Sequence, residues 1–155
     1  MKVLWLALCF FCSAVNAADM VNITVSGTLK RPPCTLSSST TLKAEFGDVR
    51  TDQVSETGTK NLPVTLNCPA GSSLKVGFSS TNGTYTSTVA KTTVDNLGVS
   101  LLWADNSAAN LQGTTKTYSN LSGTVNLSLK AQLVKRGDLS PGQFSSAMVM
   151  TITYL

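Results

Sequence analysis

The chain closes on the stretch SSAMVMTITYL, Ser145 to Leu155, and this stretch decides the fold class. Large apolar side chains alternate in it with smaller ones, and this set is Met148, Met150, Ile152 and Tyr154. A period of two is typical of a β-strand. A second stretch of the same kind, VNITVSGTL from Val21 to Leu29, lies near the start. The sequence therefore predicts a strand near each end of the chain.

The first 17 residues, MKVLWLALCFFCSAVNA, have the features of an export signal. Lys2 precedes an apolar run from Val3 to Phe11, and Val15 and Ala17 provide small or apolar residues at the −3 and −1 positions. This pattern predicts a secretory signal peptide over residues 1–17. An uncleaved anchor is the alternative, but the run is short for a membrane span.

Removal of that signal leaves two cysteines, Cys34 and Cys68. In an exported protein two cysteines most simply form one disulfide. The chain has no histidine. Two thiols and no imidazole are a poor ligand set for zinc. The sequence thus predicts a disulfide and no metal site.

The rest of the mature sequence alternates as strands do. Apolar faces recur in Leu62–Cys68, in Leu74–Phe78 and, as the longest run, in Val125–Leu133, while Val99–Trp103 is a more continuous apolar stretch. Clusters of turn residues separate these runs, at Pro69–Gly71, Thr81–Thr84, Asp105–Ser107 and Arg136–Asp138. Short strands with turns at such intervals indicate an all-β sandwich. One short helical turn is predicted near Ala108–Leu111.

The composition argues against an enzyme. Without histidine, Ser-His-Asp and Cys-His hydrolysis are excluded, and no G-x-S-x-G or phosphate-binding motif occurs. Asp48 and Asp52 flank Arg50, and we interpret these residues as surface charges. The net charge of +4 is scattered along the chain, so nothing indicates nucleic-acid binding. We predict no cofactor, no metal and no small-molecule substrate.

The stretch near the start leaves two interpretations open. Its apolar face consists of Val21, Ile23, Val25, Gly27 and Leu29. It is either the first strand of the chain's own sandwich or a strand donated to another molecule. Glycine weakens a strand, but it is suitable where another backbone or a filled groove leaves no room for a side chain.

The two ends together resemble those of pilins of the chaperone–usher pathway. Gly142 is the fourteenth residue from the end, Tyr154 is the penultimate residue, and alternating apolar residues lie between them. The segment ADMVNITVSGTLKRPPCTL is similar to the start of minor adaptor pilins of type 1-like tip fibrillae, and LNCP, Leu66–Pro69, is similar to the segment around the second cysteine. The resemblance covers the whole mature chain.

This resemblance implies a fold and a mechanism. The fold is an incomplete immunoglobulin-like sandwich, residues 32–155, which lacks its final strand. The missing strand leaves an apolar groove beside the C-terminal strand, residues 147–154. Residues 18–31 form an extension whose donor strand fills the groove of a neighbouring subunit. The residues implied at the groove are Gly142, Met148, Met150, Ile152, Tyr154 and Leu155.

The resemblance also implies partners and a location. A periplasmic chaperone first fills the groove, an outer-membrane usher exchanges it for the next subunit, and fimbriae assemble on the cell surface. The sequence therefore predicts a structural or adaptor subunit of an adhesive pilus. A major rod pilin of the same pathway is one alternative. The other is a self-contained secreted immunoglobulin-like binding module, whose first strand would fold into its own sheet.

Overall fold

The computed structural model describes residues 19–155. The predicted signal peptide, residues 1–17, lies outside the described residues. The chain divides into two units, of which the first ends at Lys30 and the second comprises Arg31–Leu155. We call residues 19–30 the extension and residues 31–155 the body. Within residues 19–155, no helix is long and apolar enough to cross a membrane.

The extension forms neither helix nor strand. Its large apolar side chains all expose at least 81% of their surface, and they are Met20, Val21, Ile23, Val25 and Leu29. The extension therefore forms no strand within the described residues, and its role as a donated strand stays a prediction. A strand needs a neighbour to accept and donate its backbone hydrogen bonds, and the extension is paired with none in the described chain.

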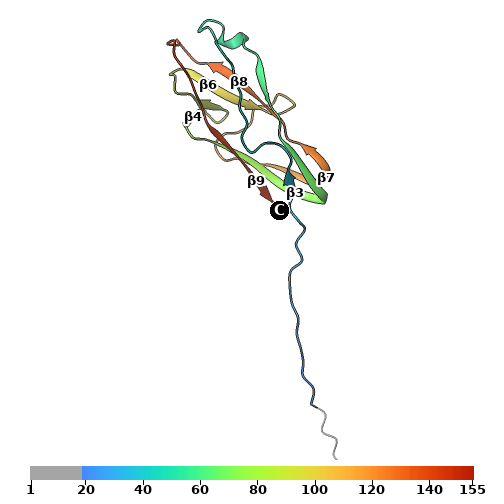
Figure 1. The fold of residues 1–155 in the computed structure, drawn as a ribbon. Coiled ribbons are helices and arrows are strands. Elements are labelled where there is room, and N and C mark those ends of the chain that lie inside the picture. Colours follow the sequence, from blue (N-terminus) through green and yellow to red (C-terminus); the bar gives the residue numbers. More distant parts are fainter. Residues whose placement is uncertain (1–18) are drawn as a thin grey trace, which may run out of the picture. The chain divides into compact units, whose positions relative to one another are not determined.

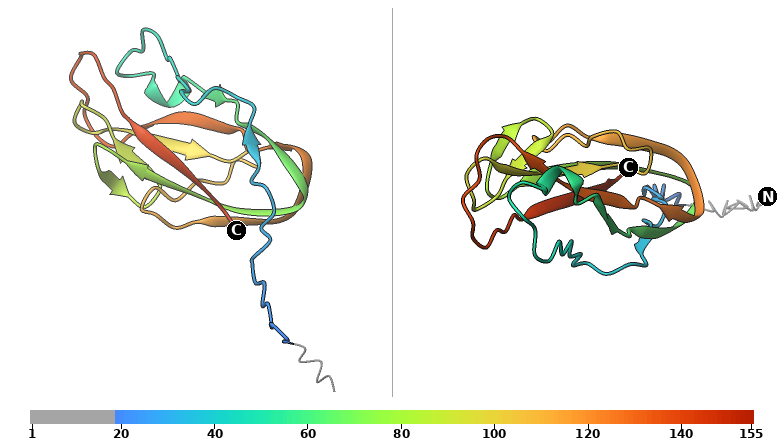
Figure 2. Two further views of the ribbon diagram at one scale, coloured as in Figure 1. Left: turned by 60° about the horizontal axis from the view of Figure 1, so that its bottom comes forward. Right: turned by 90° about the horizontal axis from the view of Figure 1, so that it is seen from above.

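The body consists of two antiparallel sheets (Figures 1 and 2). In the first sheet β3 is central and pairs with three strands. The strands of this sheet are β1 (Thr35–Leu36), β3 (Thr65–Ser80), β7 (Lys116–Asn126) and β9 (Met148–Tyr154). The second sheet has the order β2-β8-β6-β5-β4. Its strands are β2 (Thr59–Leu62), β8 (Leu129–Lys135), β6 (Leu97–Leu102), β5 (Val89–Lys91) and β4 (Thr84–Thr86). The predicted all-β sandwich is confirmed.

The core lies between the two sheets and follows the predicted alternation. Leu74, Val76 and Phe78 of β3 are buried, as are alternate residues of β8. The predicted run Val125–Leu133 is divided between β7 and β8. At the division the Leu127 amide donates to the Val64 carbonyl at 2.8 Å. The alternation therefore continues while the chain passes from one sheet to the other.

Two local predictions are wrong. The Pro69–Gly71 cluster is not a turn, because β3 runs through it with shifts in its register to β7. A bulge accommodates turn residues without ending a strand, and Gly71 has a φ of +75°. Ala108–Leu111 is not helical, since Ala108 bridges to Leu102 and the Ala109 amide donates to the Leu101 carbonyl at 2.8 Å. Besides the strands, a short 3₁₀ helix, η1 (Val54–Glu56), follows the first part of the body.

The predicted disulfide between Cys34 and Cys68 is present, with an S–S distance of 2.09 Å. Both cysteines are buried. Cys34 immediately precedes β1, and Cys68 lies in β3, the strand with which β1 pairs. The bridge therefore fastens the start of the body to the central strand of its sheet.

Candidate functional site: an apolar groove beside the last strand

The last strand, β9, has a pairing partner on one edge only within residues 19–155. That partner is β3, with a regular register from Ser80 opposite Met148 to Leu74 opposite Tyr154. The core-facing side chains of β9 pack against the core but are only partly buried, and these are Met148, Met150 and Ile152. The free edge therefore leaves both backbone groups and apolar side chains without cover.

The opposite wall belongs to residues 39–46, which form no strand. Leu42, Ala44 and Phe46 are partly buried and pack against the core, while Lys43 and Glu45 between them are exposed. The segment thus has the alternation of a strand, yet it belongs to neither sheet. A buried or half-buried backbone without ladder partners is a favourable place for an added strand.

A groove with a volume of about 680 Å³ lies between these two walls. Its floor is formed by buried core residues of both sheets: Phe78, Val99, Leu101, Leu129 and Ala131. One wall is β9 with the residues before it, and the other wall is the 39–46 segment. An apolar groove bordered by an unpaired strand edge fits an extended segment with apolar side chains on one face.

A second hollow with a volume of about 990 Å³ adjoins the groove. Residues 44–52 line one side of it, and residues 139–144 of the loop before β9 line the other. Phe46 and Phe144 line both hollows. These two rings therefore stand at the boundary between the groove and the second hollow.

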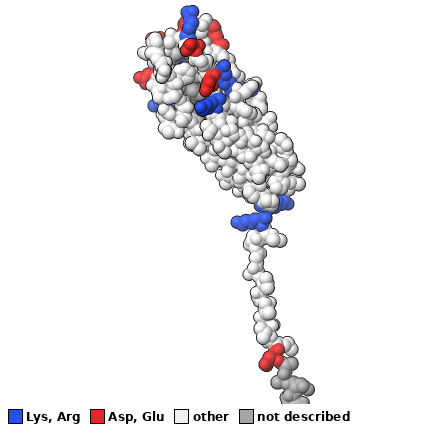
Figure 3. All heavy atoms as spheres, in the orientation of Figure 1, with Lys and Arg blue, Asp and Glu red and all other residues white. Residues whose placement is uncertain are grey.

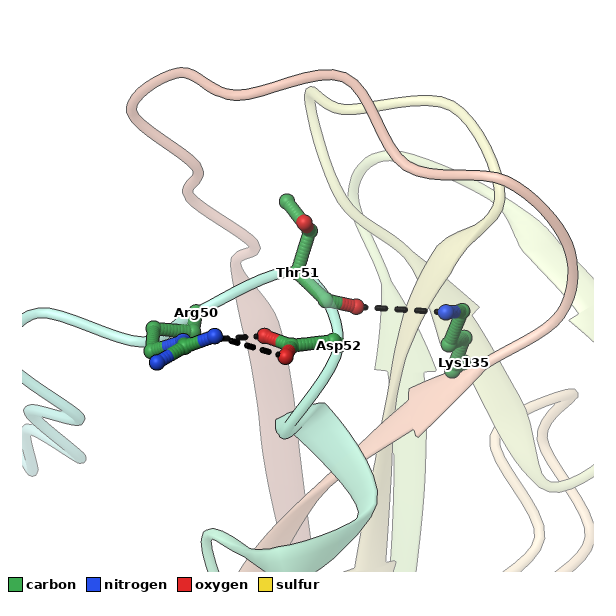
Figure 4. A network of polar contacts seen from close by, with 4 residues as sticks. All are labelled: Arg50, Thr51, Asp52 and Lys135. Carbon is green, nitrogen blue, oxygen red and sulfur yellow. Dashed lines mark hydrogen bonds and ion pairs between the residues drawn. The ribbon is translucent and has the colours of Figure 1, made fainter.

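Charged side chains gather at the end of the body away from the C terminus (Figure 3). Four of them line the second hollow: Glu45, Asp48, Arg50 and Asp52. The Arg50 guanidinium donates to both oxygens of Asp52, at 3.0 and 2.8 Å (Figure 4). Lys135 Nζ donates to the Thr51 carbonyl at 3.2 Å, also drawn in Figure 4. These contacts hold the 50–52 turn against the end of β8.

Shifted pKa values occur away from the groove. Hydrogen bonds from the Ser107 hydroxyl and amide lower the pKa of Asp105, and burial together with the charge of Asp105 raises the pKa of Tyr118. Neither side chain lines the groove or the second hollow. Among the described residues no cluster of His, Cys, Asp and Glu suits a metal ion. The chemistry that the groove offers is apolar contact and backbone hydrogen bonding.

The structure places the predicted groove residues in three groups. Met148, Met150 and Ile152 line the groove. Gly142 lies in the loop before β9 and lines the second hollow instead. Tyr154 ends β9 and is 40% exposed, and the Leu155 amide donates to the Ser73 carbonyl at 3.0 Å.

Sequence reasoning missed the opposite wall. Phe46 and Phe144 were not among the predicted site residues, although both line the groove. The alternation of Leu42, Ala44 and Phe46 was a usable signal for that wall. No comparable signal marks Phe144, because the loop that carries it has no regular period.

The model of the family described as "Fimbrial protein" matches residues 23–154. Among solved structures, the P pilus rod subunit PapA matches 80% of this chain and 100% of its own, with 19% identity and a TM-score of 0.66. A subunit in the structure of a chaperone–usher pilus matches 92% and 100%, with 18% identity and a TM-score of 0.64.

The P pilus adaptor subunit PapF matches 80% of this chain and 97% of its own, with 22% identity and a TM-score of 0.55. No curated protein matches the chain. At these identities the solved structures show the fold, and the family model covers most of the sequence. The chain belongs to the fimbrial protein family and is a pilus subunit.

Proposed function

We propose that this pilus subunit joins its neighbours by strand exchange: its extension fills the groove of one neighbour, and its own groove accepts the extension of another. One observation carries the proposal. The described chain has an apolar extension that is exposed along its whole length, and an apolar groove beside the unpaired edge of β9, lined by the partly exposed Met148, Met150 and Ile152. The extension offers apolar side chains and an unpaired backbone, and the groove offers an apolar lining and an unpaired strand edge to receive them. Strand addition to a free sheet edge is a general mode of recognition.

The spacing of apolar residues favours one register for the added strand. Val21, Ile23 and Val25 match the three groove-facing residues of β9 in number and in spacing, because both sets alternate with a period of two. Gly27 then lies at the boundary made by Phe46 and Phe144, where the absence of a side chain avoids a clash with these two rings. Leu29 enters the second hollow beyond them. In this register the added strand runs antiparallel to β9.

The same geometry supports the proposed helpers. An uncovered strand edge with apolar side chains promotes aggregation, so the groove needs a temporary strand before assembly. We assign this role to a periplasmic chaperone, whose basic residues anchor the carboxylate of Leu155, and the exchange to an outer-membrane usher. Because the contact joins different surfaces of successive subunits, it builds an open fibre on the cell surface and not a closed ring.

The extension also bears on the alternative of a self-contained binding module. Such a module requires that the extension forms a strand, whereas residues 19–30 form none. Both the rod and the adaptor role remain consistent with strand exchange, since both use a donor and a groove.

The first test is to produce the body, residues 31–155, in a periplasm without a pilus chaperone. We expect it to aggregate or to be degraded, because the core beside β9 is uncovered. Refolding the purified body with a synthetic peptide of residues 19–31 should give a soluble monomer with one bound peptide. Size-exclusion chromatography with native mass spectrometry measures both results.

The matched control is a peptide in which Val21, Ile23, Val25 and Leu29 are replaced by serine. It keeps the length and the charge but cannot fill the groove. If the body is stable and monomeric alone, or if the serine peptide rescues it equally well, the groove is not a strand-accepting site and strand exchange is rejected.

The register makes a further prediction at Gly27. In the peptide, Gly27→Leu should weaken the complex by roughly 1–3 kcal/mol, because a large side chain is forced against Phe46 and Phe144. Thr28→Leu is the control, since residue 28 lies on the polar face and points away from the groove. Thermal unfolding of the two complexes compares them. Equal unfolding temperatures would place the glycine elsewhere and refute this register.

A further inference from the structure

Two carboxylates line the second hollow, Glu45 and Asp48, and we call them the acidic rim; Glu45 also lines the groove. Both side chains line the second hollow and both are exposed. Within residues 19–155, neither carboxylate lies within 4.0 Å of a basic nitrogen, whereas Asp52 is paired with Arg50. The acidic rim is therefore a pair of like charges without a counterion from the described chain.

Three basic groups of this part of the body contact other groups. Arg50 is held by Asp52, and Lys135 Nζ contacts the Thr51 carbonyl. Lys60 Nζ lies 6.0 Å from the centroid of the Phe46 ring. Lys43 lines the groove but not the second hollow. A cation brought to the acidic rim by another molecule would therefore meet two unpaired carboxylates.

The extension carries such a cation in the right place. Lys30 directly follows Leu29, and it belongs to the polar face of the extension, together with Thr28. The next residue, Arg31, is not available, because its Nη1 donates to the Gly71 carbonyl of its own body at 2.6 Å. Lys30 is thus the free positive charge at the end of the donor segment.

The register given above brings the two together. With Leu29 in the second hollow, the backbone of Lys30 lies only about 3.3 Å further along the strand. Its side chain faces outward, as do Lys43 and Glu45 on the opposite wall. Residues 42–48 run from the groove towards the second hollow, so Glu45 and Asp48 lie nearer to Lys30 than Lys43 does.

We propose that the acidic rim of one subunit binds the Lys30 ammonium of a second copy of this chain, which selects the chain's own extension as the occupant of its groove. This inference rests on the strand exchange proposed above. The pair is exposed, so the attraction is screened by salt and acts mainly on the rate at which the extension is captured. Glu45 and Asp48 are then specificity-determining residues for self-assembly.

The test uses the mature chain, residues 18–155, diluted from denaturant, with fibre growth followed by light scattering and electron microscopy. Two variants are compared, Lys30→Glu and the double variant Glu45→Lys/Asp48→Lys. Each alone places like charges at every junction, and we expect growth to slow by about tenfold at low salt. In an equimolar mixture the two variants can alternate along the fibre, so that every junction pairs opposite charges. The mixture should therefore grow within about twofold of the rate of the unsubstituted chain.

Glu56→Lys is the control, because Glu56 is exposed and lines neither the groove nor the second hollow. Its growth rate should equal that of the unsubstituted chain. Lys30→Glu leaves the body untouched, and binding of the 19–31 peptide to the double variant reports whether that body folds. If the double variant grows slowly and also fails to bind the peptide at high salt, its body is misfolded. In that case the growth rate of Lys30→Glu decides the test.

Each outcome has a distinct meaning. Unchanged growth of Lys30→Glu, or a mixture as slow as its components, overturns the role of the acidic rim. If the unsubstituted chain grows no fibres although the 19–31 peptide rescues the body, the occupant is a different subunit and only this inference fails. If the peptide fails to rescue the body, the proposed strand exchange itself fails.

Discussion

Fusing residues 19–30 behind Leu155 through a short glycine–serine linker is expected to raise the free energy of unfolding of the body by on the order of 5 kcal/mol. The linker turns the donor back along the free edge of β9 in the antiparallel direction. Burial of the four large side chains contributes roughly 6–12 kcal/mol as an upper estimate. The ordering of the donor opposes this gain, while new ladder hydrogen bonds and the cover given to Met148, Met150 and Ile152 support it.

Urea denaturation followed by tryptophan fluorescence measures this change. Trp103 is a suitable reporter because it packs edge-on against Phe78, a floor residue of the groove, with ring centroids 5.4 Å apart. The control is the same fusion with serine at the four apolar positions. A graded series that begins with Val25→Ala keeps the comparison possible if that control is insoluble. A fusion no more stable than its serine version would contradict the groove as the donor site.

Replacing both cysteines, Cys34→Ser together with Cys68→Ser, is expected to lower the free energy of unfolding by about 3.8 kcal/mol. The bridge closes a loop with a sequence separation of 34. Closing a loop of this size removes that much conformational freedom from the unfolded chain. The cost is serious here, since an unfilled apolar groove already lies beside β9. We expect the double variant of the body to fail to fold without a donor strand.

The strand-fused protein described above is the form in which to measure it, because its added stability keeps the variant folded. Denaturation of that protein with and without reductant gives a second measure that needs no substitution. The double serine variant is the control for the reductant, and reductant should not destabilise it further. A loss below about 1 kcal/mol in both experiments would show that the bridge contributes little to stability.

The sequence by itself determined the features that depend on local pattern and composition. The alternation of Met148, Met150 and Ile152 predicted β9, and two cysteines in an exported chain predicted the bridge. The same local reasoning identified the apolar face of the extension, although the extension forms no strand by itself. Such features are readable because a period of two, or a pair of thiols, needs no knowledge of distant residues.

Only the tertiary structure decided where these features meet. It placed Pro69–Gly71 inside β3, and it placed Gly142, which the resemblance implied at the groove, in the wall of the second hollow. It also brought Phe46 and Phe144, almost a hundred positions apart in the sequence, into the lining of the same two hollows. Local periodicity reports which face of a segment is apolar. Which distant segment covers that face, and where none does, is settled by the packing of the two sheets.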